Sequence, residues 1–236
     1  MSWYPGKLIE RFFKFHSQVA YEEELFKKAL YFDKLPSAFE VKEVIRNLTT
    51  YNYTVFWNLI NKYGIFQFWN KEYIECLSRN IKNLVESNLV LEVAAGDGML
   101  SYWLRHYGVN IVATDSGAWY DRIKKHAEVE IIDAVSAIRK YKPSMVIASW
   151  LPYDDPVDLD VFNTSSQLNI RYIILIGETN GACGSRKFWE EEYWAKVGYV
   201  LNFLDECDRW NYCRTDYFSV GEIYKHSSTQ LYMKVR

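Results

Sequence analysis

Three acidic residues and two glycines share a stretch of the chain in which their spacing suits the binding of a nucleotide-like molecule. Glu92 lies near the end of a short apolar run, the turn Gly96-Asp97-Gly98 follows, and Asp115 comes directly after a second apolar run. Glycines in such a turn let backbone amides approach a ligand closely, because no Cβ stands in the way. A carboxylate after the second run can accept hydrogen bonds from a ribose diol. The stretch therefore predicts a site for a nucleotide-like cofactor.

The elements that position these residues follow from the hydrophobic pattern. Apolar residues fill 89–93 and 110–114, and an amphipathic stretch, 98–107, lies between them, which predicts a strand–helix–strand unit. Further short apolar runs follow at 129–132, 144–149, 172–176, 199–203 and 230–235. Because the earlier runs alternate with helical segments, we expect an α/β domain with a doubly wound, mostly parallel sheet. Ser185 is placed to cap a helix that runs through Trp194.

The residues before this domain, 1–86, are predicted to form a helical extension. Helical spacing of apolar residues begins at Leu8, a Ser-x-x-Glu capping box begins at Ser37, and Asn70 is placed to cap a later helix. We expect the extension to form a cap over a cofactor-binding domain at 87–236. A plain structural extension is the alternative.

Composition narrows the class of partner. The net charge of −2 disfavours a nucleic-acid partner, since affinity for phosphate backbones usually comes with a basic excess. No apolar run approaches the roughly 20 residues of a membrane span, and the N-terminus lacks the pattern of a signal peptide. We therefore expect a cytoplasmic protein without a membrane partner. The sequence leaves its oligomeric state open.

The four cysteines contain no Cys-x-x-Cys pair, so no zinc site is predicted. Buried free thiols are the expected state. A disulfide between Cys207 and Cys213 is the alternative if the source is a hyperthermophile, in which intracellular disulfides occur.

Taken in order, these residues give 88–236 a resemblance to the class I S-adenosylmethionine (SAM)-dependent methyltransferases. Their first motif, an acid shortly before a Gly-x-Gly, is similar to Glu92-Val-Ala-Ala-Gly96-Asp97-Gly98. Asp115 stands where that family has its ribose-binding acid, Asp133-Ala134 matches the pair beside the adenine, and 149–153 occupies the catalytic position after the fourth strand. The resemblance implies a Rossmann-like fold with an antiparallel C-terminal hairpin, and SAM as cofactor.

A closer likeness is to a little-characterised group of predicted methyltransferases. Its members pair a Trp-Pro-Pro-Tyr-Asp-Asp-Pro-like loop with a Gly-Glu-x-x-Gly-Gly-Cys-like turn. This chain has Trp150-Leu-Pro-Tyr-Asp-Asp-Pro156 and Gly177-Glu-Thr-Asn-Gly-Ala-Cys183, and it departs from the pattern at Leu151 and Ala182. The segment Tyr63-Gly-Ile-Phe-Gln-Phe-Trp69 looks like that group's lead-in. No substrate follows from this likeness.

Each part of SAM finds a suitable group among the matched residues. Asp115 suits the ribose diol and Asp133 the adenine amino group, although an acid at Asp133 also suits the cap of the next helix. Trp119 is a candidate for stacking on the adenine, with a core position as the alternative. The predicted cofactor-binding residues are Glu92, Ala94, Gly96, Asp97, Gly98, Asp115, Ser116, Asp133, Ala134, Ser149 and Trp150.

Tyr153 and Asp154 are the catalytic candidates, because an acid or a phenol beside the acceptor can orient a nucleophile or take its proton. In related amine methyltransferases the first residue of this loop accepts a hydrogen bond from the target amino group. Trp150 stands there in this chain, and an indole N–H only donates. An adenine-N6 or glutamine-amide group is therefore not the expected methyl acceptor. With the net charge, a small molecule or a protein is favoured over a nucleic acid.

Two other classes of function stay open. A binding or scaffold protein that keeps the fold without catalysis fits the loss of the acceptor at Trp150. A nicotinamide-dependent dehydrogenase is the third hypothesis, but its fingerprint needs a third glycine where this chain has Ser101.

Overall fold

The computed structural model describes residues 23–24, 34–51, 53–118, 128–179 and 182–235 of the 236-residue chain. Leu8, where the predicted helical spacing begins, and Trp119, the candidate for adenine stacking, lie outside these residues.

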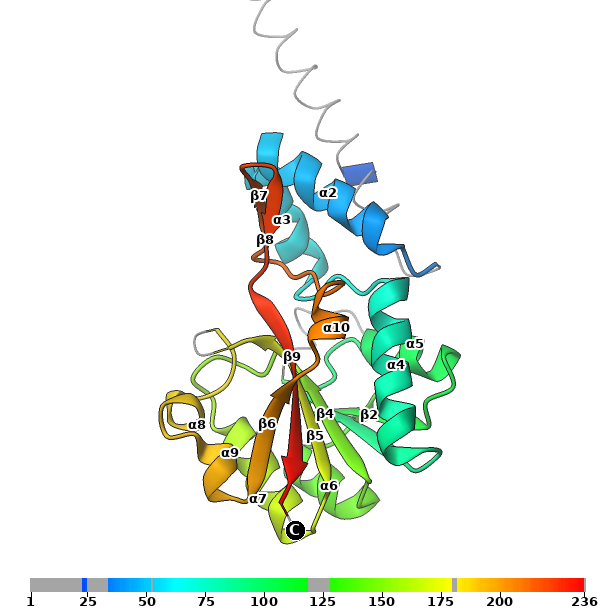
Figure 1. Cartoon of the computed structure of the whole chain (residues 1–236), viewed down its shortest axis with the longest axis vertical. Coiled ribbons are helices and arrows are strands. Elements are labelled where there is room, and N and C mark those ends of the chain that lie inside the picture. Colours follow the sequence, from blue (N-terminus) through cyan, green and yellow to red (C-terminus); the bar gives the residue numbers. More distant parts are fainter. Residues whose placement is uncertain (1–22, 25–33, 52, 119–127, 180–181, 236) are drawn as a thin grey trace, which may run out of the picture.

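One seven-stranded sheet forms the centre of the molecule (Figure 1). Its strand order is β3-β2-β1-β4-β5-β9-β6. The strands are β1 (Val90–Val93), β2 (Ile111–Asp115), β3 (Glu130–Ile131), β4 (Met145–Ser149), β5 (Tyr172–Glu178), β6 (Tyr199–Phe203) and β9 (Ser227–Lys234). The first five run parallel, and β9 pairs antiparallel with both β5 and β6. The predicted doubly wound, mostly parallel sheet with an antiparallel C-terminal hairpin is confirmed.

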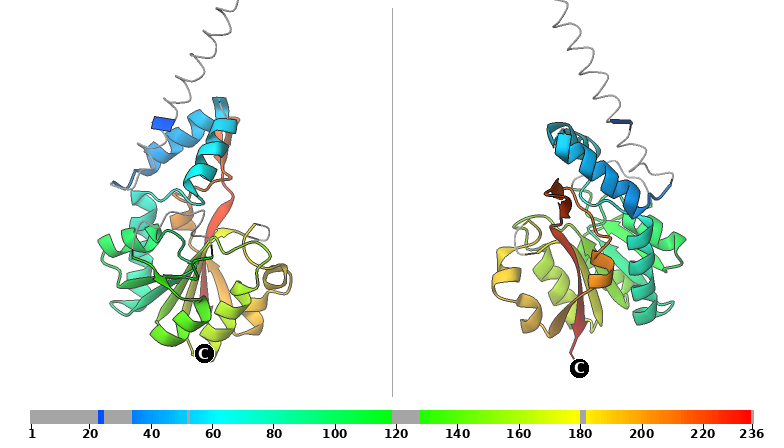
Figure 2. Two further views of the ribbon diagram at one scale, coloured as in Figure 1. Left: turned by 180° about the vertical axis from the view of Figure 1, so that it is seen from behind. Right: turned by 45° about the horizontal axis from the view of Figure 1, so that its top comes forward.

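Helices cover both faces of the sheet (Figure 2). On one face lie α4 (Lys71–Val85) and α5 (Met99–His106), whose apolar residues share a core with β1, β4 and β5. The second core, on the other face, contains residues of α6 (Ala134–Tyr141), α7 (Val157–Gln167), α8 (Arg186–Glu190) and α9 (Tyr193–Lys196). Because both faces are covered, the central strands are almost continuously apolar.

The N-terminal helices form a third apolar cluster, beyond the end of the sheet (Figure 2). They are α2 (Ala38–Tyr51) and α3 (Tyr53–Tyr63). The predicted capping box is present, since the Glu40 amide donates to Ser37 Oγ at 3.2 Å and the Ser37 amide donates to Glu40 Oε2 at 2.7 Å. Asn70 caps α4, as expected, by accepting from the Tyr73 amide at 3.0 Å.

An excursion between β6 and β9 is absent from the sequence-based prediction. It contains α10 (Asp205–Asp208) and a hairpin of β7 (Tyr217–Ser219) with β8 (Glu222–Tyr224). The hairpin packs on α2, where the Phe218 amide donates to Thr49 Oγ1 at 3.0 Å. The excursion therefore joins the C-terminal part of the chain to the N-terminal helices.

Two further details bear on the predictions. The single helix expected from Ser185 through Trp194 is wrong: Ser185 caps α8, but the chain turns at Glu192, whose φ of 46° is left-handed, before α9 begins. The boundary at 86/87 stays a prediction. The apolar face of α4, which precedes it, belongs to the core of the sheet.

All four cysteines are buried and free, as expected. Cys207 faces Cys76 rather than Cys213, so the alternative pairing of Cys207 with Cys213 is not formed. Among the described residues, no helix combines the length and the apolar character needed to cross a bilayer.

Candidate functional site

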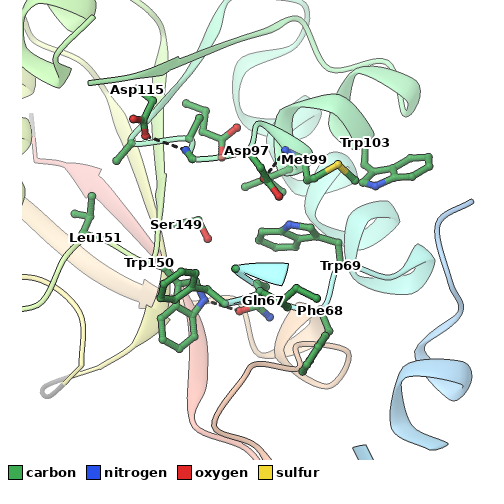
Figure 3. A pocket seen from close by; sticks show the side chains of 18 of the residues that line it. Gln67, Phe68, Trp69, Asp97, Met99, Trp103, Asp115, Ser149, Trp150 and Leu151 are labelled. Carbon is green, nitrogen blue, oxygen red and sulfur yellow. Dashed lines mark hydrogen bonds between the residues drawn. The ribbon is translucent and has the colours of Figure 1, made fainter. Parts of the chain in front are cut away.

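A cavity of about 410 Å³ opens at the carboxyl ends of β1, β2 and β4 (Figure 3). Its wall contains residues from the turn after β1, from the loop after β4, and from the segment 64–69 that leads into α4. The carboxyl edge of parallel strands is the usual ligand site of an open α/β sheet. The sheet and the cavity together define a Rossmann-like α/β domain with a candidate ligand site at its carboxyl edge.

The turn after β1 is held open by backbone geometry and by an acid from β2. Asp115 Oδ2 accepts from the Gly96 amide at 2.9 Å, and Oδ1 accepts from the Gly117 amide at 2.7 Å. Gly96 has a φ of +56°, and a Cβ added to it would meet no atom within 4 Å. A glycine here thus keeps space free along the cavity wall. Asp97 Oδ1 accepts from the Met99 amide at 3.0 Å, at the start of α5.

Two carboxyl groups of this turn have raised pKa values. Burial raises the pKa of Glu92, which is only 1% exposed, to about 8, and the Ser101 amide at 3.1 Å offsets part of that effect. Burial also raises the pKa of Asp97 to about 6. Because burial disfavours the charged form of a carboxyl, Glu92 is mostly protonated at neutral pH, whereas Asp97 is mostly charged. The charge that this turn offers to a positively charged ligand is therefore that of Asp97.

Trp150 forms the opposite wall of the cavity, together with Gln67 (Figure 3). Its indole N–H donates to Gln67 Oε1 at 2.9 Å, and its ring lies 5.8 Å from that of Phe66. The backbone of Trp150 has a φ of 55°, and its amide donates to Ile176 O at 2.8 Å. The indole is thereby fixed against the lead-in segment, and its only donor is engaged.

Gln67 connects the cavity to the C-terminal excursion. Its Nε2 donates to Tyr212 O at 2.6 Å and to Asn211 Oδ1, which also accepts from Ser227 Oγ at 2.8 Å. Sequence reasoning did not assign Gln67 to the site. The signal that pointed there was the likeness of the lead-in, 63–69, to a methyltransferase group.

The catalytic candidates occupy different positions. Tyr153 borders the cavity, is 58% exposed, and accepts a hydrogen bond at 3.5 Å from Arg186 Nη2. Asp154 is exposed and does not belong to the cavity wall; its amide donates to Gly184 O at 2.9 Å. Of the two, Tyr153 is the one that the fold brings to the cavity.

The other predicted cofactor residues divide in the same way. Those that line the cavity are Glu92, Ala94, Gly96, Asp97, Asp115, Ser149 and Trp150. The wall, as far as the described residues form it, does not include Gly98, Ser116, Asp133 or Ala134. Asp133 caps α6, since its Oδ1 accepts from the Ser136 amide at 2.9 Å, and this hydrogen bond holds its pKa below the usual value. A role for these four residues stays a prediction.

Aromatic side chains that sequence reasoning left unassigned make up much of the remaining wall. Phe66 and Phe68 come from the lead-in segment with Trp69, and Trp103 comes from α5. The sequence offered no periodic signal that separated them from core aromatics.

Three solved structures with a similar course of the chain are those of methyltransferases. No family model and no curated protein matches the sequence. The CcbJ methyltransferase from Streptomyces caelestis has a TM-score of 0.49 at 10% identity, over 70% of this chain and 91% of that chain. Magnesium protoporphyrin IX methyltransferase from Synechocystis PCC 6803, with bound SAM, gives 0.42 at 14% identity, over 82% and 97%. Precorrin-6y C5,15-methyltransferase from Geobacter metallireducens GS-15 gives 0.46 at 11% identity, over 70% and 89%. At these identities the likeness concerns the fold alone.

Proposed function

We propose that this chain binds SAM in the cavity and transfers its methyl group to an acceptor held beside Trp150 and Tyr153. The single observation that carries the proposal is the arrangement of Asp115. This carboxylate holds the Gly96 amide at 2.9 Å and the Gly117 amide at 2.7 Å at the edge of an open cavity. A carboxylate has about four lone-pair sites, so acceptor capacity remains for a ribose diol.

The charge of the site favours SAM over a nicotinamide dinucleotide. A dinucleotide places its pyrophosphate at the start of the helix after the first strand. Here the carboxyl of Asp97 already accepts from the Met99 amide at that helix start, and the carboxyl of Glu92 is buried close behind. The carboxyl of Asp97 is mostly charged at neutral pH, so it disfavours phosphate at this position and favours the ammonium and sulfonium groups of SAM. We therefore rank the dehydrogenase hypothesis last.

The cofactor residues proposed to hold SAM fit the cavity by chemistry. Asp115 would accept from the ribose hydroxyls, the backbone at 94–98 would face the amino-acid end, and Asp97 would lie near the ammonium group. SAM would supply a methyl group activated by a sulfonium. The proposed roles of Asp133 and Ala134 at the adenine rest on the motif alone.

The chain's own contribution to the transfer is proposed to be positioning and the exclusion of water. Methyl transfer is an in-line displacement, and holding the two reactants in line supplies much of the acceleration. Phe66, Trp69 and Trp103 give the cavity an apolar wall, which supports a small molecule or a single side chain of a protein as acceptor. Tyr153 is proposed to orient the acceptor or take its proton, and Asp154 to assist from outside.

A non-catalytic SAM-binding scaffold is the second candidate function. One observation favours it. The Trp150 side chain cannot accept a hydrogen bond, and its indole N–H is already engaged by Gln67 Oε1 at 2.9 Å. The first residue of the loop therefore has no side-chain atom that could orient the group to be methylated. In that case the protein would bind SAM, and no member of a broad panel of candidate methyl acceptors would become methylated.

Thermal shift and methyl transfer test the proposal together. We expect SAM and its demethylated product, S-adenosylhomocysteine (SAH), to raise the melting temperature, and NADH to leave it unchanged. Transfer from methyl-labelled SAM to a panel of small amines, phenols, carboxylates and peptides should fall in Tyr153→Phe and persist in Asp160→Ala. Asp160 is an exposed acid on α7 and serves as the matched control. Stabilisation by NADH but not by SAM would reverse the assignment.

A further inference from the structure

Two buried thiols face each other outside the cavity. Cys76 is on α4 and Cys207 is on α10, 131 residues apart in the chain, and their Sγ atoms lie 2.7 Å apart. Both thiols are free, and the side-chain amide of Asn80 lies against both, with Nδ2 at 3.7 Å from Cys76 Sγ and 3.6 Å from Cys207 Sγ. The proposed methyl transfer uses neither cysteine.

We propose that Cys76 and Cys207 form a redox pair that a small-molecule disulfide oxidises to a disulfide bond between α4 and α10. The distance supports this bond over the two alternatives. The sulfur atoms of a disulfide lie about 2.05 Å apart, so only a small movement of the two Sγ atoms toward each other would be needed to form the bond. Cys213, the partner that the sequence suggested for Cys207, instead places its Sγ 3.1 Å from Asp216 Oδ1 and 3.2 Å from Thr215 Oγ1.

A metal ion is the other ligand that this cluster could take. Cys76, Cys207 and Glu206 place one ligand atom each within 4.8 Å of one another. Two thiolates on one tetrahedral zinc, at about 2.3 Å from the metal, would lie about 3.8 Å apart. The thiols are much closer than that, and Glu206 is exposed. The geometry therefore favours a direct bond between the sulfurs.

The reaction balances with one equivalent of oxidised glutathione. Cys76 is the more exposed of the two thiols, so its thiolate attacks a sulfur of glutathione disulfide and expels one glutathione thiolate. Burial raises the pKa of Cys207, which makes it the resolving thiol. The Cys207 thiolate then attacks Cys76 Sγ, the new S–S bond forms, and the second glutathione thiolate leaves. Two protons are released, and two electrons pass from the protein to the oxidant.

The bond would fasten the part of the chain that supports the cavity wall. Asp208, the residue after Cys207, accepts from the Thr229 amide at 2.8 Å, and Asn211 accepts from Gln67, which in turn holds Trp150. A cross-link between positions this far apart restricts the unfolded chain strongly. We expect the oxidised protein to melt roughly 10 °C above the reduced protein.

Peptide mapping of the full chain tests the pair. The protein is incubated with oxidised glutathione or with a phosphine reductant, alkylated under denaturing conditions, and digested without reduction. We expect a cross-linked peptide that joins Cys76 to Cys207 in the oxidised sample, with Cys183 and Cys213 alkylated. Cys76→Ala should lose both the cross-link and the rise in melting temperature, and Cys183→Ala, a matched loss of another buried thiol, should keep both.

Three results would overturn the proposal. One is alkylation of all four cysteines after oxidation, and another is a cross-link that joins Cys207 to Cys213. The third is metal analysis showing one equivalent of zinc that protects Cys76 and Cys207 until a chelator is added. None of these results bears on SAM binding, so the redox pair and the proposed function fail separately.

Discussion

Glu92 provides the sharpest test of the electrostatics of the turn, because its carboxyl is buried at the end of β1. Its pKa is raised from the ordinary 4.5 to about 8 by burial. The unfolded chain therefore releases this proton as the pH rises through 4.5, while the folded chain keeps it until about pH 8. Stability from the retained proton is fully present below pH 4.5 and is lost as the pH rises through the folded pKa.

The size of the effect follows from the shift. At about 1.4 kcal/mol per unit of pKa, a change from 4.5 to about 8 corresponds to roughly 5 kcal/mol of unfolding free energy. Glu92→Gln removes the titration and keeps an oxygen that can accept from the Ser101 amide. Relative to the variant, wild type should lose roughly 3–4 kcal/mol of stability between pH 5 and pH 8, since part of the titration lies outside this range.

Urea unfolding of the ligand-free protein, followed by tryptophan fluorescence at several pH values, measures this difference. Asp133→Asn is the control, because Asp133 is exposed on the same edge of the sheet and its pKa is lowered by the Ser136 amide. Relative to Asp133→Asn, wild type should lose no stability between pH 5 and pH 8. Parallel pH profiles for wild type and Glu92→Gln would refute the reasoning.

Three further variants test other parts of the site. Burial raises the pKa of Asp97 to about 6, so this carboxyl becomes charged between pH 5 and pH 7. Calorimetry should therefore show the affinity for SAM rising about tenfold over this range. In Asp97→Asn the affinity should not change with pH. Gly96→Ala should lower the unfolding free energy by about 1 kcal/mol, and the control Gly221→Ala should do the same, because Gly221 has a similarly left-handed φ of +84°. Only Gly96→Ala should weaken SAH binding, by tenfold or more; equal SAH affinities in the two variants would contradict the assignment of the cavity. Trp150→Phe leaves the buried Gln67 Oε1 without its donor and should reduce the unfolding free energy by about 1–3 kcal/mol in urea titrations. A change below about 0.5 kcal/mol would show that this hydrogen bond contributes little to stability.

The parts of the fold that the sequence predicted are those with local signals. The apolar runs placed β1, β2, β4 and β5 within about two residues, and Ser37 and Asn70 marked helix starts through their own capping chemistry. The acid after β2 and the glycine turn after β1 were expected to converge, because the carboxyl ends of parallel strands meet at one edge. The hydrogen bond between Asp115 and the Gly96 amide is that convergence.

The parts that sequence reasoning missed depend on contacts between distant residues. Nothing near Gln67 indicates that its amide meets Trp150, 83 residues later, or Asn211, 144 residues later. The excursion after β6 has short strands and little apolar periodicity, and it is stabilised against α2 rather than by its own core. The break before α9 depends on the left-handed backbone of Glu192, and glutamate is not a residue type that predicts such a turn. Local patterns carry no information of these three kinds.

The most direct test of the central claim is a calorimetric titration of SAH into wild type, Asp115→Ala and Asp160→Ala. If Asp115 binds the ribose diol at the edge of the cavity, wild type and Asp160→Ala should bind one equivalent, and Asp115→Ala should bind at least tenfold more weakly, the change of about 1.4 kcal/mol or more that loss of hydrogen bonds to a charged group produces. Folding of each variant is checked by its circular dichroism spectrum. Absence of binding to wild type, or binding to a folded Asp115→Ala with unchanged affinity, would contradict the assignment of the cavity to SAM.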